Sequence, residues 1–173
     1  MTAYVALLRA IGPVTHAAMP LGRLATACSA AGLETVSTIG NTGNLVFASP
    51  RPQAEVERLV GDAITGFGLA NDVFTRTARQ FRKLIDAAPF PDAAAERPAQ
   101  LGVCFFHKDP SWPAAYLHYR GPERLTMLSN HLIIDYGGAA STSRLTVEKT
   151  VGARMTQRSW SSILRIAAAL AAM

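Results

Sequence analysis

Several features that would assign a function at once are missing from this sequence of 173 residues. It has only two cysteines, Cys28 and Cys104, and they form no Cys-x-x-Cys or Cys/His spacing, so we expect buried thiols and no structural zinc site. No Gly-x-Ser-x-Gly, His-Glu-x-x-His or phosphate-loop lysine motif occurs. The sequence therefore assigns no reaction, catalytic residue, metal or cofactor. The scattered histidines have no carboxylate or nucleophile partner at meaningful spacing: His16, His107, His118 and His131.

Long apolar runs are also missing. The most apolar stretch, Ile163 to Met173, is too short and too rich in alanine to span a bilayer. The segment Met1-Thr2-Ala3-Tyr4 has no basic region followed by a long apolar one, so we expect no secretory signal. These absences predict a cytoplasmic protein that makes no use of a membrane.

Charge is sparse and unevenly supplied. Charged residues make up 17% of the chain and apolar residues 49%, which is typical of a globular protein and not of a disordered one. The formal net charge is +5, and lysine occurs only at Lys83, Lys108 and Lys149, so arginine supplies most of the positive charge. Arginine suits planar recognition of phosphate or carboxylate. A charge of this size supports weak attraction to polyanions but does not define a site.

The first half of the chain alternates strand-like and helix-like segments. The unbroken apolar run Tyr4–Leu8 predicts a central strand, and a loop through Gly12 and Pro13 follows it. A helix with Pro20 at its first position is expected to end at Gly32. The next segments predict a hairpin, an amphipathic helix and a strand, over Thr35–Ile39 with Leu45–Ala48, Gln53–Phe67 and Asp72–Thr75. This order is the split βαβ pattern of ferredoxin-like domains.

The turn of the predicted hairpin, Gly40-Asn41-Thr42-Gly43-Asn44, holds more turn-forming residues than a minimal hairpin needs. Glycine and asparagine enter positive φ at the lowest cost. Amides and carboxamides clustered in such a bend can hold an anion. A well-formed turn without a ligand is the alternative interpretation.

The middle of the chain separates two parts. Thr77-Ala78-Arg79-Gln80 has the capping-box pattern and predicts a short helix, with Phe81, Leu84 and Ile85 facing inward. The prolines at 89, 91 and 98 predict a linker over residues 89–100. We therefore expect a ferredoxin-like half over residues 1–88 and an α+β half over residues 101–173.

The second half repeats a similar order. Strands are expected over Leu101–His107, Arg124–Leu128 and His131–Tyr136, with a short helix over Pro113–Leu117. Ser141-Thr142-Ser143 is expected to cap a helix over Arg144–Val151. The last helix is predicted to place five apolar residues on one face: Trp160, Ile163, Leu164, Ala167 and Leu170. The fold class is therefore α+β, with two ferredoxin-like βαββαβ-type halves and helices on one face of mainly antiparallel sheets.

Four segments resemble a family of uncharacterised proteins, domain of unknown function 1697. Tyr4-Val5-Ala6-Leu7-Leu8-Arg9 is similar to its opening strand, and Gly43-Asn44-Leu45-Val46-Phe47 to its Ser-Gly-Asn-Val-Val-Phe segment. Arg76-Thr77 with Pro89-Phe90 resembles its Arg-Thr-Ala helix start and Pro-Phe end. The chain's ending resembles the family's Ser-Lys-Leu-Thr and Thr-x-Arg-Asn-Trp segments, at Ser143-Arg144-Leu145-Thr146 and Thr156-Gln157-Arg158-Ser159-Trp160. The resemblance implies a two-part α+β fold and no known reaction.

The chain also departs from the family pattern. After the first strand the family has a glycine-rich loop, Arg-Gly-Ile-Asn-Val-Gly-Gly, whereas this chain has Arg9-Ala10-Ile11-Gly12-Pro13-Val14. Pro13 removes one amide that an anion-binding loop would use. Ser159 stands where the family has asparagine, and Arg144 where it has lysine. If the family loop binds a phosphate, this member has lost or changed that capacity.

The leading hypothesis is a site for a small anionic or phosphorylated ligand. Arg9 lies at a strand end, where ligands bind in layered architectures, beside Asn41 and Asn44 of the hairpin. Arg144 and Arg158 precede or begin predicted helices, whose free amides favour anions. The alternative interpretation is that each arginine pairs locally on the surface.

A nucleic-acid-binding module that uses the basic surface is the alternative function. Phe105, Phe106 and His107 share a predicted strand, and RNA-recognition sheets stack bases on such aromatics. Strand alternation leaves at most one phenylalanine on a face with His107, and the full recognition signature is missing, so burial in the core is the competing interpretation. Asp135 is the best-placed acid, but a turn-forming role is the simpler one. A homodimer formed through an unpaired sheet edge is a third hypothesis.

Overall fold

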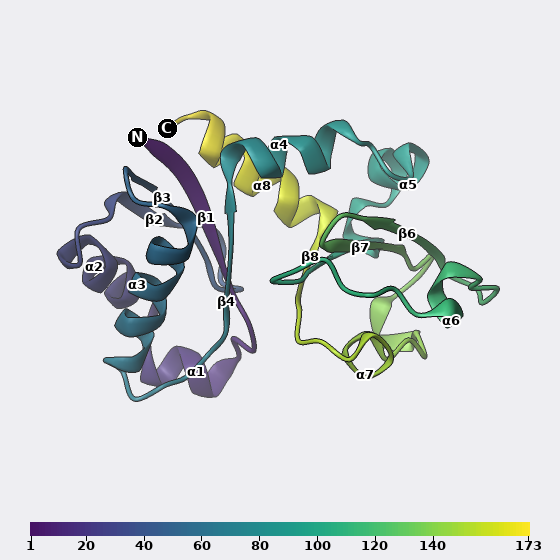
Figure 1. The fold of residues 1–173 in the computed structure, drawn as a ribbon, viewed down its shortest axis with the longest axis horizontal. Helices are drawn as coiled ribbons and strands as arrows, with labels where there is room; N and C mark the ends of the chain where they lie inside the picture. The colour runs from purple at the N-terminus through teal and green to yellow at the C-terminus, as the bar shows by residue number, and fades with distance from the viewer. The chain divides into compact units, whose positions relative to one another are not determined.

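The computed structural model describes residues 1–173 and divides them into two compact units. The N-terminal unit comprises Met1–Lys83 together with Leu164–Met173, and the C-terminal unit comprises Leu84–Ile163. Each unit contains its own four-stranded sheet (Figure 1). No helix is both long enough and apolar enough to cross a membrane.

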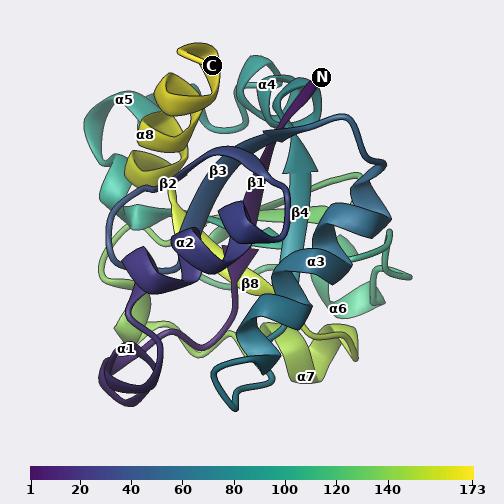
Figure 2. The same cartoon turned by 90° about the vertical axis from the view of Figure 1, so that its left-hand side faces the viewer.

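The sheet of the N-terminal unit has the strand order β2-β3-β1-β4, and all neighbours are antiparallel. Its strands are β1 (Thr2–Leu8), β2 (Glu34–Thr38), β3 (Asn44–Ser49) and β4 (Val73–Thr77). Helices α2 (Leu21–Ala30) and α3 (Gln53–Thr65) lie across one face of the sheet, as Figure 2 shows. β1 is central, as its unbroken apolar run predicts, because both of its edges are paired.

The core of the N-terminal unit follows from strand and helix periodicity. Tyr4, Ala6 and Leu8 alternate along β1 and point to the face that α2 and α3 cover. These helices turn their apolar stripes to the same core, with Leu24, Cys28, Val56, Val60 and Ile64 among its buried members. The amphipathic stripe over α3 is therefore confirmed as a core face.

A helix that the sequence pattern does not reveal follows β1. α1 (Pro13–Ala18) occupies the segment expected to be a loop. Pro13 lies in its first turn, where the missing N–H of proline costs no hydrogen bond. No residue of α1 is buried, so the helix has no apolar periodicity that could have indicated it.

The C-terminal unit repeats the order of the first. Its strands are β5 (Leu101–Phe105), β6 (Arg124–Leu128), β7 (His131–Asp135) and β8 (Thr156–Ser159), in the antiparallel sheet order β6-β7-β5-β8. Tyr116 of α6 (Ala114–Leu117) and Val147 of α7 (Val147–Val151) join Cys104 and Leu132 in one core cluster. The predicted fold class is confirmed, since each unit has the βαββαβ order and a mainly antiparallel sheet.

Two elements near the end of the chain differ from the sequence-based expectation. The sequence pattern does not locate β8, because its four residues, Thr-Gln-Arg-Ser, show no alternation of apolar and polar side chains. α8 (Trp160–Ala171) turns Ile166 inward, with no exposed surface, while Leu164, which was expected on the inner face, is 45% exposed.

The proline-rich segment is folded rather than open. It contains α5 (Pro91–Glu96) and the 3-10 turn η1 (Pro98–Gln100), each of which begins with a proline in its first turn. The prolines therefore start short helices here. Whether residues 89–100 separate two domains stays a prediction.

The hairpin of β2 and β3 forms as predicted, and its turn requires glycine at Gly43. Gly40 and Gly43 have φ of 66° and 79°, the left-handed region that side chains disfavour. A Cβ atom added to Gly43 would lie 2.6 Å from Cγ1 of Ile11 and 3.0 Å from Cβ of Leu8. Backbone conformation and close packing thus both exclude a side chain at this position.

We predict that Gly43→Ala lowers the free energy of unfolding by at least about 2 kcal/mol, because strain and overlap add. Chemical denaturation measures this loss. Gly61→Ala is the matched control, because Gly61 lies inside α3 with open space around its Cβ position. The control should raise stability by about 0.5–1 kcal/mol. Equal effects of the two substitutions would contradict the steric account.

Candidate functional site

The five residues of the sequence-predicted site fall in different units. Arg9, Asn41 and Asn44 belong to the N-terminal unit, and Arg144 and Arg158 to the C-terminal unit. Arg9 follows β1: its N–H donates to the carbonyl oxygen of Asp72 at 2.9 Å, and its own carbonyl accepts from Nδ2 of Asn71 at 2.9 Å. Asn41 is exposed on the hairpin turn.

Asn44 is buried and its side chain closes the hairpin. It is 2% exposed, and its Nδ2 donates to the carbonyl oxygen of Ile39 at 2.9 Å and to Oγ1 of Thr42 at 3.0 Å. These bonds hold the turn from inside. The surplus of turn-forming residues in this segment therefore has a structural use.

Arg144 does not begin a helix, so that part of the expectation is wrong. It is exposed in the segment between the 3-10 turn η2 (Ala140–Thr142) and α7. Ser143, the expected cap, donates its hydroxyl to Glu123 instead, and its oxygen accepts from the N–H of Leu145 at 3.2 Å. The hydroxyl is thus used in a tertiary contact, and the helix starts later.

Arg158 lies inside β8 and is buried. It is 6% exposed, and Nη1 donates to Oγ1 of Thr156 at 2.7 Å and to the carbonyl oxygen of Gln157 at 2.8 Å. Burial lowers the pKa of its guanidinium to about 10. The side chain of Gln157 contacts Tyr136 and Cys104 in the helix-covered core, so Arg158, its neighbour along the strand, points to the opposite face.

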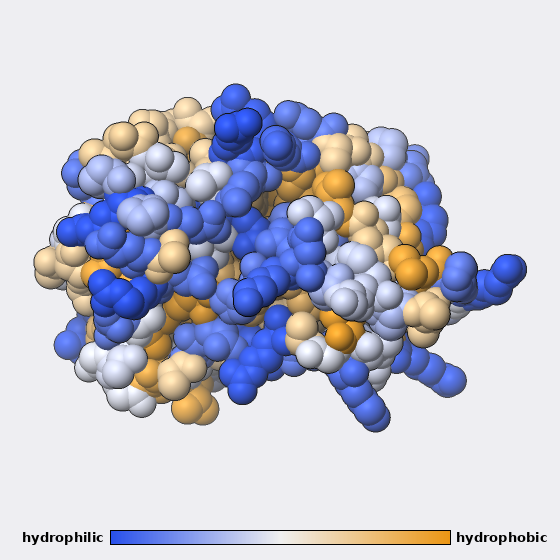
Figure 3. Space-filling view, in the orientation of Figure 1, coloured by the Kyte–Doolittle hydropathy of each residue, from blue (hydrophilic) through white to orange (hydrophobic).

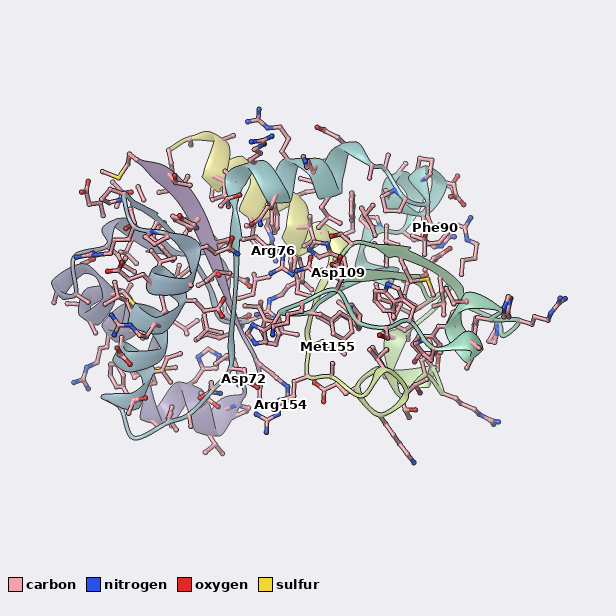
Figure 4. The ribbon with its side chains drawn as sticks, in the orientation of Figure 1. Asp72, Arg76, Phe90, Asp109, Arg154 and Met155 are labelled. Atoms are coloured by element: carbon pink, nitrogen blue, oxygen red, sulfur yellow. The ribbon has the colours of Figure 1, made fainter.

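Sequence reasoning missed the counterpart of Arg158, which is Arg76 in β4 (Figure 4). Arg76 pairs with Val5 of β1, as Arg158 pairs with Val103 of β5, and it is 3% exposed. Its Nη1 donates to the carbonyl oxygen of Thr75 at 2.7 Å. A signal was available, because each arginine is followed by a hydroxyl residue and then by a helix.

A pocket of about 550 Å³ opens in the N-terminal unit where β1 and α4 (Ala78–Asp86) begin; we call it the α4 pocket. Hydrophilic side chains cover the region of α4 in the space-filling view (Figure 3). No acidic residue lines the pocket. Its lining comes from the start of β1 and from the β4–α4 junction: Thr2, Ala3, Thr77, Ala78, Arg79, Gln80 and Lys83.

The pocket has two cations without partners. Arg79 and Lys83 are exposed, one helical turn apart, and neither makes an ion pair or hydrogen bond in the structure. Elsewhere arginines at this spacing face a carboxylate: Arg58 contacts Asp62 at 2.6 Å on α3. Like charges four residues apart cost a helix about 0.2–0.5 kcal/mol.

The predicted capping box forms at the mouth of the pocket. The N–H of Thr77 donates to Oε1 of Gln80 at 2.8 Å, and the N–H of Gln80 donates to Oγ1 of Thr77 at 3.1 Å. The two bonds satisfy donors at the first turn of α4 and fix both side chains. Sequence reasoning found this motif and assigned it to helix initiation alone.

The C-terminal unit contains an ion-pair network in which, by contrast, each arginine contacts a carboxylate. Asp135 at the end of β7 is 3% exposed and accepts from Nη2 of Arg97 at 2.6 Å and from Nε of Arg124 at 2.8 Å. Burial alone would raise the pKa of Asp135, but the hydrogen bonds from the two arginines outweigh it and lower the pKa to about 2.

The network attaches the proline-rich segment to the sheet. Arg97 connects the end of α5 to the sheet, and Nη2 of Arg124 also donates to Asp92 of α5 at 2.7 Å. The Arg124 guanidinium lies 4.7 Å from the ring centre of Phe90, which Figure 4 marks next to α5. Asp135 also accepts from the N–H of Gly137 at 3.0 Å, the turn-forming role that the sequence indicates.

Other predicted groups are buried. Cys28 and Cys104 are free buried thiols, as expected, and burial raises the pKa of Cys28 to about 11. Phe105 and Phe106 have at most 1% exposure, so the core interpretation of these rings is confirmed. No three metal-ligating side chains lie together.

We predict that Asp135 stabilises the protein most above about pH 5. Its pKa is lower in the folded state than in the unfolded state, so its contribution, about 2 kcal/mol, is lost as the pH falls toward 2. Asp135→Asn should therefore cost much more stability at pH 7 than at pH 3, measured by urea denaturation. Asp62→Asn, which removes an exposed pair, should cost less than about 1 kcal/mol at both. A cost of Asp135→Asn that does not change with pH would contradict the assignment.

Comparison with known proteins agrees with this architecture. A solved structure, the conserved bacterial protein SP0830 from Streptococcus pneumoniae, is similar with a TM-score of 0.74 and 16% identity, over 99% of both chains. At that identity the likeness shows the fold alone. Among curated proteins, none matches the chain. Residues 1–125 match the family model described as "Protein of unknown function (DUF1697)", so the chain belongs to the DUF1697 family.

Proposed function

We propose that the protein binds a small anionic or phosphorylated ligand in the α4 pocket. The observation that carries the proposal is the pair of unpartnered cations, Arg79 and Lys83, on a pocket without any acidic residue. A volume of about 550 Å³ lies within the range of small-molecule sites, about 300–1,000 Å³.

Electrostatics favour an anion at this position. The mutual repulsion of Arg79 and Lys83 is relieved when a negative group lies between them. The start of α4 adds its dipole in the same direction. Thr77 and Ala78, in the segment that resembles the family's Arg-Thr-Ala, line the same pocket.

The site residues predicted from the sequence are less well suited to bind a ligand than those of the α4 pocket. Asn44 and Arg158 are buried and bonded to neighbouring groups, so their polar atoms hold structure together. A ligand site that combines Arg9, Asn41 and Arg144 with them stays a prediction. The proposal therefore keeps the ligand class and moves the site to α4.

We predict that Arg79→Gln and Lys83→Gln each weaken binding of ribose 5-phosphate about tenfold. A hydrogen bond to a charged group contributes about 1.5 kcal/mol, which corresponds to that factor. Isothermal titration calorimetry at low salt measures the affinity, with inorganic phosphate as a second probe.

Arg82→Gln is the matched control, because Arg82 is an exposed cation of the same helix that does not line the pocket. It should change the affinity less than twofold. If all three substitutions weaken binding equally, net charge alone accounts for the effect. If no phosphate compound binds, the proposal fails.

Nucleic-acid binding is the second candidate, and one observation favours it. Arg79, Arg82 and Lys83 together place three exposed cations on α4, more than the pocket uses. The buried rings of Phe105 and Phe106 offer no stacking surface, so binding would rest on phosphate contacts.

For this candidate we predict that single-stranded RNA binds at 50 mM salt and that its affinity falls steeply toward 200 mM. Fluorescence anisotropy with a labelled oligonucleotide measures both. Arg82→Gln should then weaken RNA binding as much as Arg79→Gln does, which separates a polyanion surface from the pocket. Lack of binding at 50 mM salt removes the candidate.

A further inference from the structure

We infer that the α4 pocket is selective for a phosphoryl group, and that Gln80 is the residue that determines this selectivity. The inference rests on the proposed function, because it concerns the ligand class of the same pocket. Its basis is that the hydrogen bonds of the capping box leave the amide nitrogen of Gln80 and the hydroxyl hydrogen of Thr77 as donors in the lining.

The orientation of the Gln80 carboxamide follows from its partner. The N–H of Thr77 can only donate, so the atom of Gln80 at 2.8 Å from it must be the oxygen Oε1. The amide nitrogen Nε2 then points away from the backbone. Gln80 lines the pocket, and its Nε2 has no acceptor in the structure.

The hydroxyl of Thr77 is oriented in a similar way. Its Oγ1 accepts the N–H of Gln80 at 3.1 Å, which leaves the hydroxyl hydrogen unused. Thr77 is a member of the pocket lining, so this hydrogen is a second donor for a bound group.

The start of β1 contributes a third donor. The pairing of β1 with β4 stops at Tyr4 and Thr77, because Ala78, which would continue it, begins α4. The N–H of Arg9 points toward β4, where it donates to Asp72. N–H groups alternate in direction along an antiparallel strand, so the N–H of Ala3 points toward the β4 side, as that of Arg9 does. No residue of β4 lies opposite Ala3, and Ala3 belongs to the pocket lining.

A lining made of donors suits a phosphoryl group better than a carboxylate. Arg79, Lys83, Gln80, Thr77 and Ala3 all offer hydrogens, and no lining side chain offers a free carboxylate oxygen. A phosphate monoester presents three acceptor oxygens and close to two negative charges, whereas a carboxylate presents two oxygens and one charge. Ribose 5-phosphate should therefore bind at least tenfold more tightly than the carboxylate gluconate.

The decisive variant is Gln80→Glu. Glutamate is the other residue that completes a capping box, so its carboxylate still accepts from the N–H of Thr77 and the fold is retained. Its second oxygen replaces the donor Nε2 with a negatively charged acceptor. Calorimetry should show a loss of ribose 5-phosphate affinity of at least tenfold, while the melting temperature stays within about 2 °C of the wild type. Gln80→Ala is the companion variant, which loses both the cap and the donor.

The outcomes separate this inference from the proposed function. If Arg79→Gln and Lys83→Gln weaken binding but Gln80→Glu does not, the pocket binds anions and the role of Gln80 is overturned. If gluconate binds as tightly as ribose 5-phosphate, selectivity for a phosphoryl group is overturned. If Arg79→Gln and Lys83→Gln have no effect, the pocket is not the site and both proposals fall. Loss of affinity in Gln80→Glu with an unchanged melting temperature supports the inference.

Discussion

The direct junction between the fourth strand and the following helix is the constraint on which both units depend. In the N-terminal unit Arg76 and Thr77 end β4 and α4 starts at once; in the C-terminal unit Arg158 and Ser159 end β8 and α8 starts at once. A strand residue must stop pairing and cap a helix within one peptide. A hydroxyl side chain does this by accepting a backbone N–H three residues on, from Gln80 to Thr77 and from Ser162 to Ser159. The arginine before each hydroxyl is buried, and its hydrogen bonds to adjacent backbone hold the strand end in place.

The sequence predicts those helices, strands and turns whose formation depends on residues close to one another in the chain. The run in β1, the glycines of the hairpin, the stripe of α3 and the capping box of α4 each specify structure within a few residues, and each is found. The elements that the sequence does not indicate are stabilised from elsewhere. β8 consists of polar residues that pair because β5 offers an open edge, and α5 is held by the contacts of Arg97 and Arg124 with Asp135, 38 and 11 residues away. α1 has no buried face, so its sequence carries no apolar signal.

In the candidate site, too, some features can be predicted from the sequence and others depend on the folded structure. Sequence reasoning selected arginines beside strand ends and helix starts, but it had no means of knowing which arginines are buried. Arg158 proved to be 6% exposed, whereas Arg79 and Lys83, which sequence gives no reason to prefer, are exposed without partners. The partners of Glu123 were not predictable either, since one of the two hydroxyls it accepts belongs to Ser143, 20 residues away in the sequence. Pairing between residues of different elements is a property of tertiary structure, so the sequence alone does not show which cations stay unpaired.

Comparison of the two junctions separates what the fold requires from what a ligand would use. Aligned on Thr77 and Ser159, the positions of Arg79, Gln80 and Lys83 correspond to Ser161, Ser162 and Arg165 in the C-terminal half. The hydroxyl cap and the buried arginine occur in both junctions, because both strands must end in the same way. The second cation and the long carboxamide occur only in the first, and the fold of the second forms without them. Two neighbouring positive charges on α4 lower helix stability slightly and serve no cap or core. Their presence at a junction that lines a pocket is the physical reason to look for an anion there.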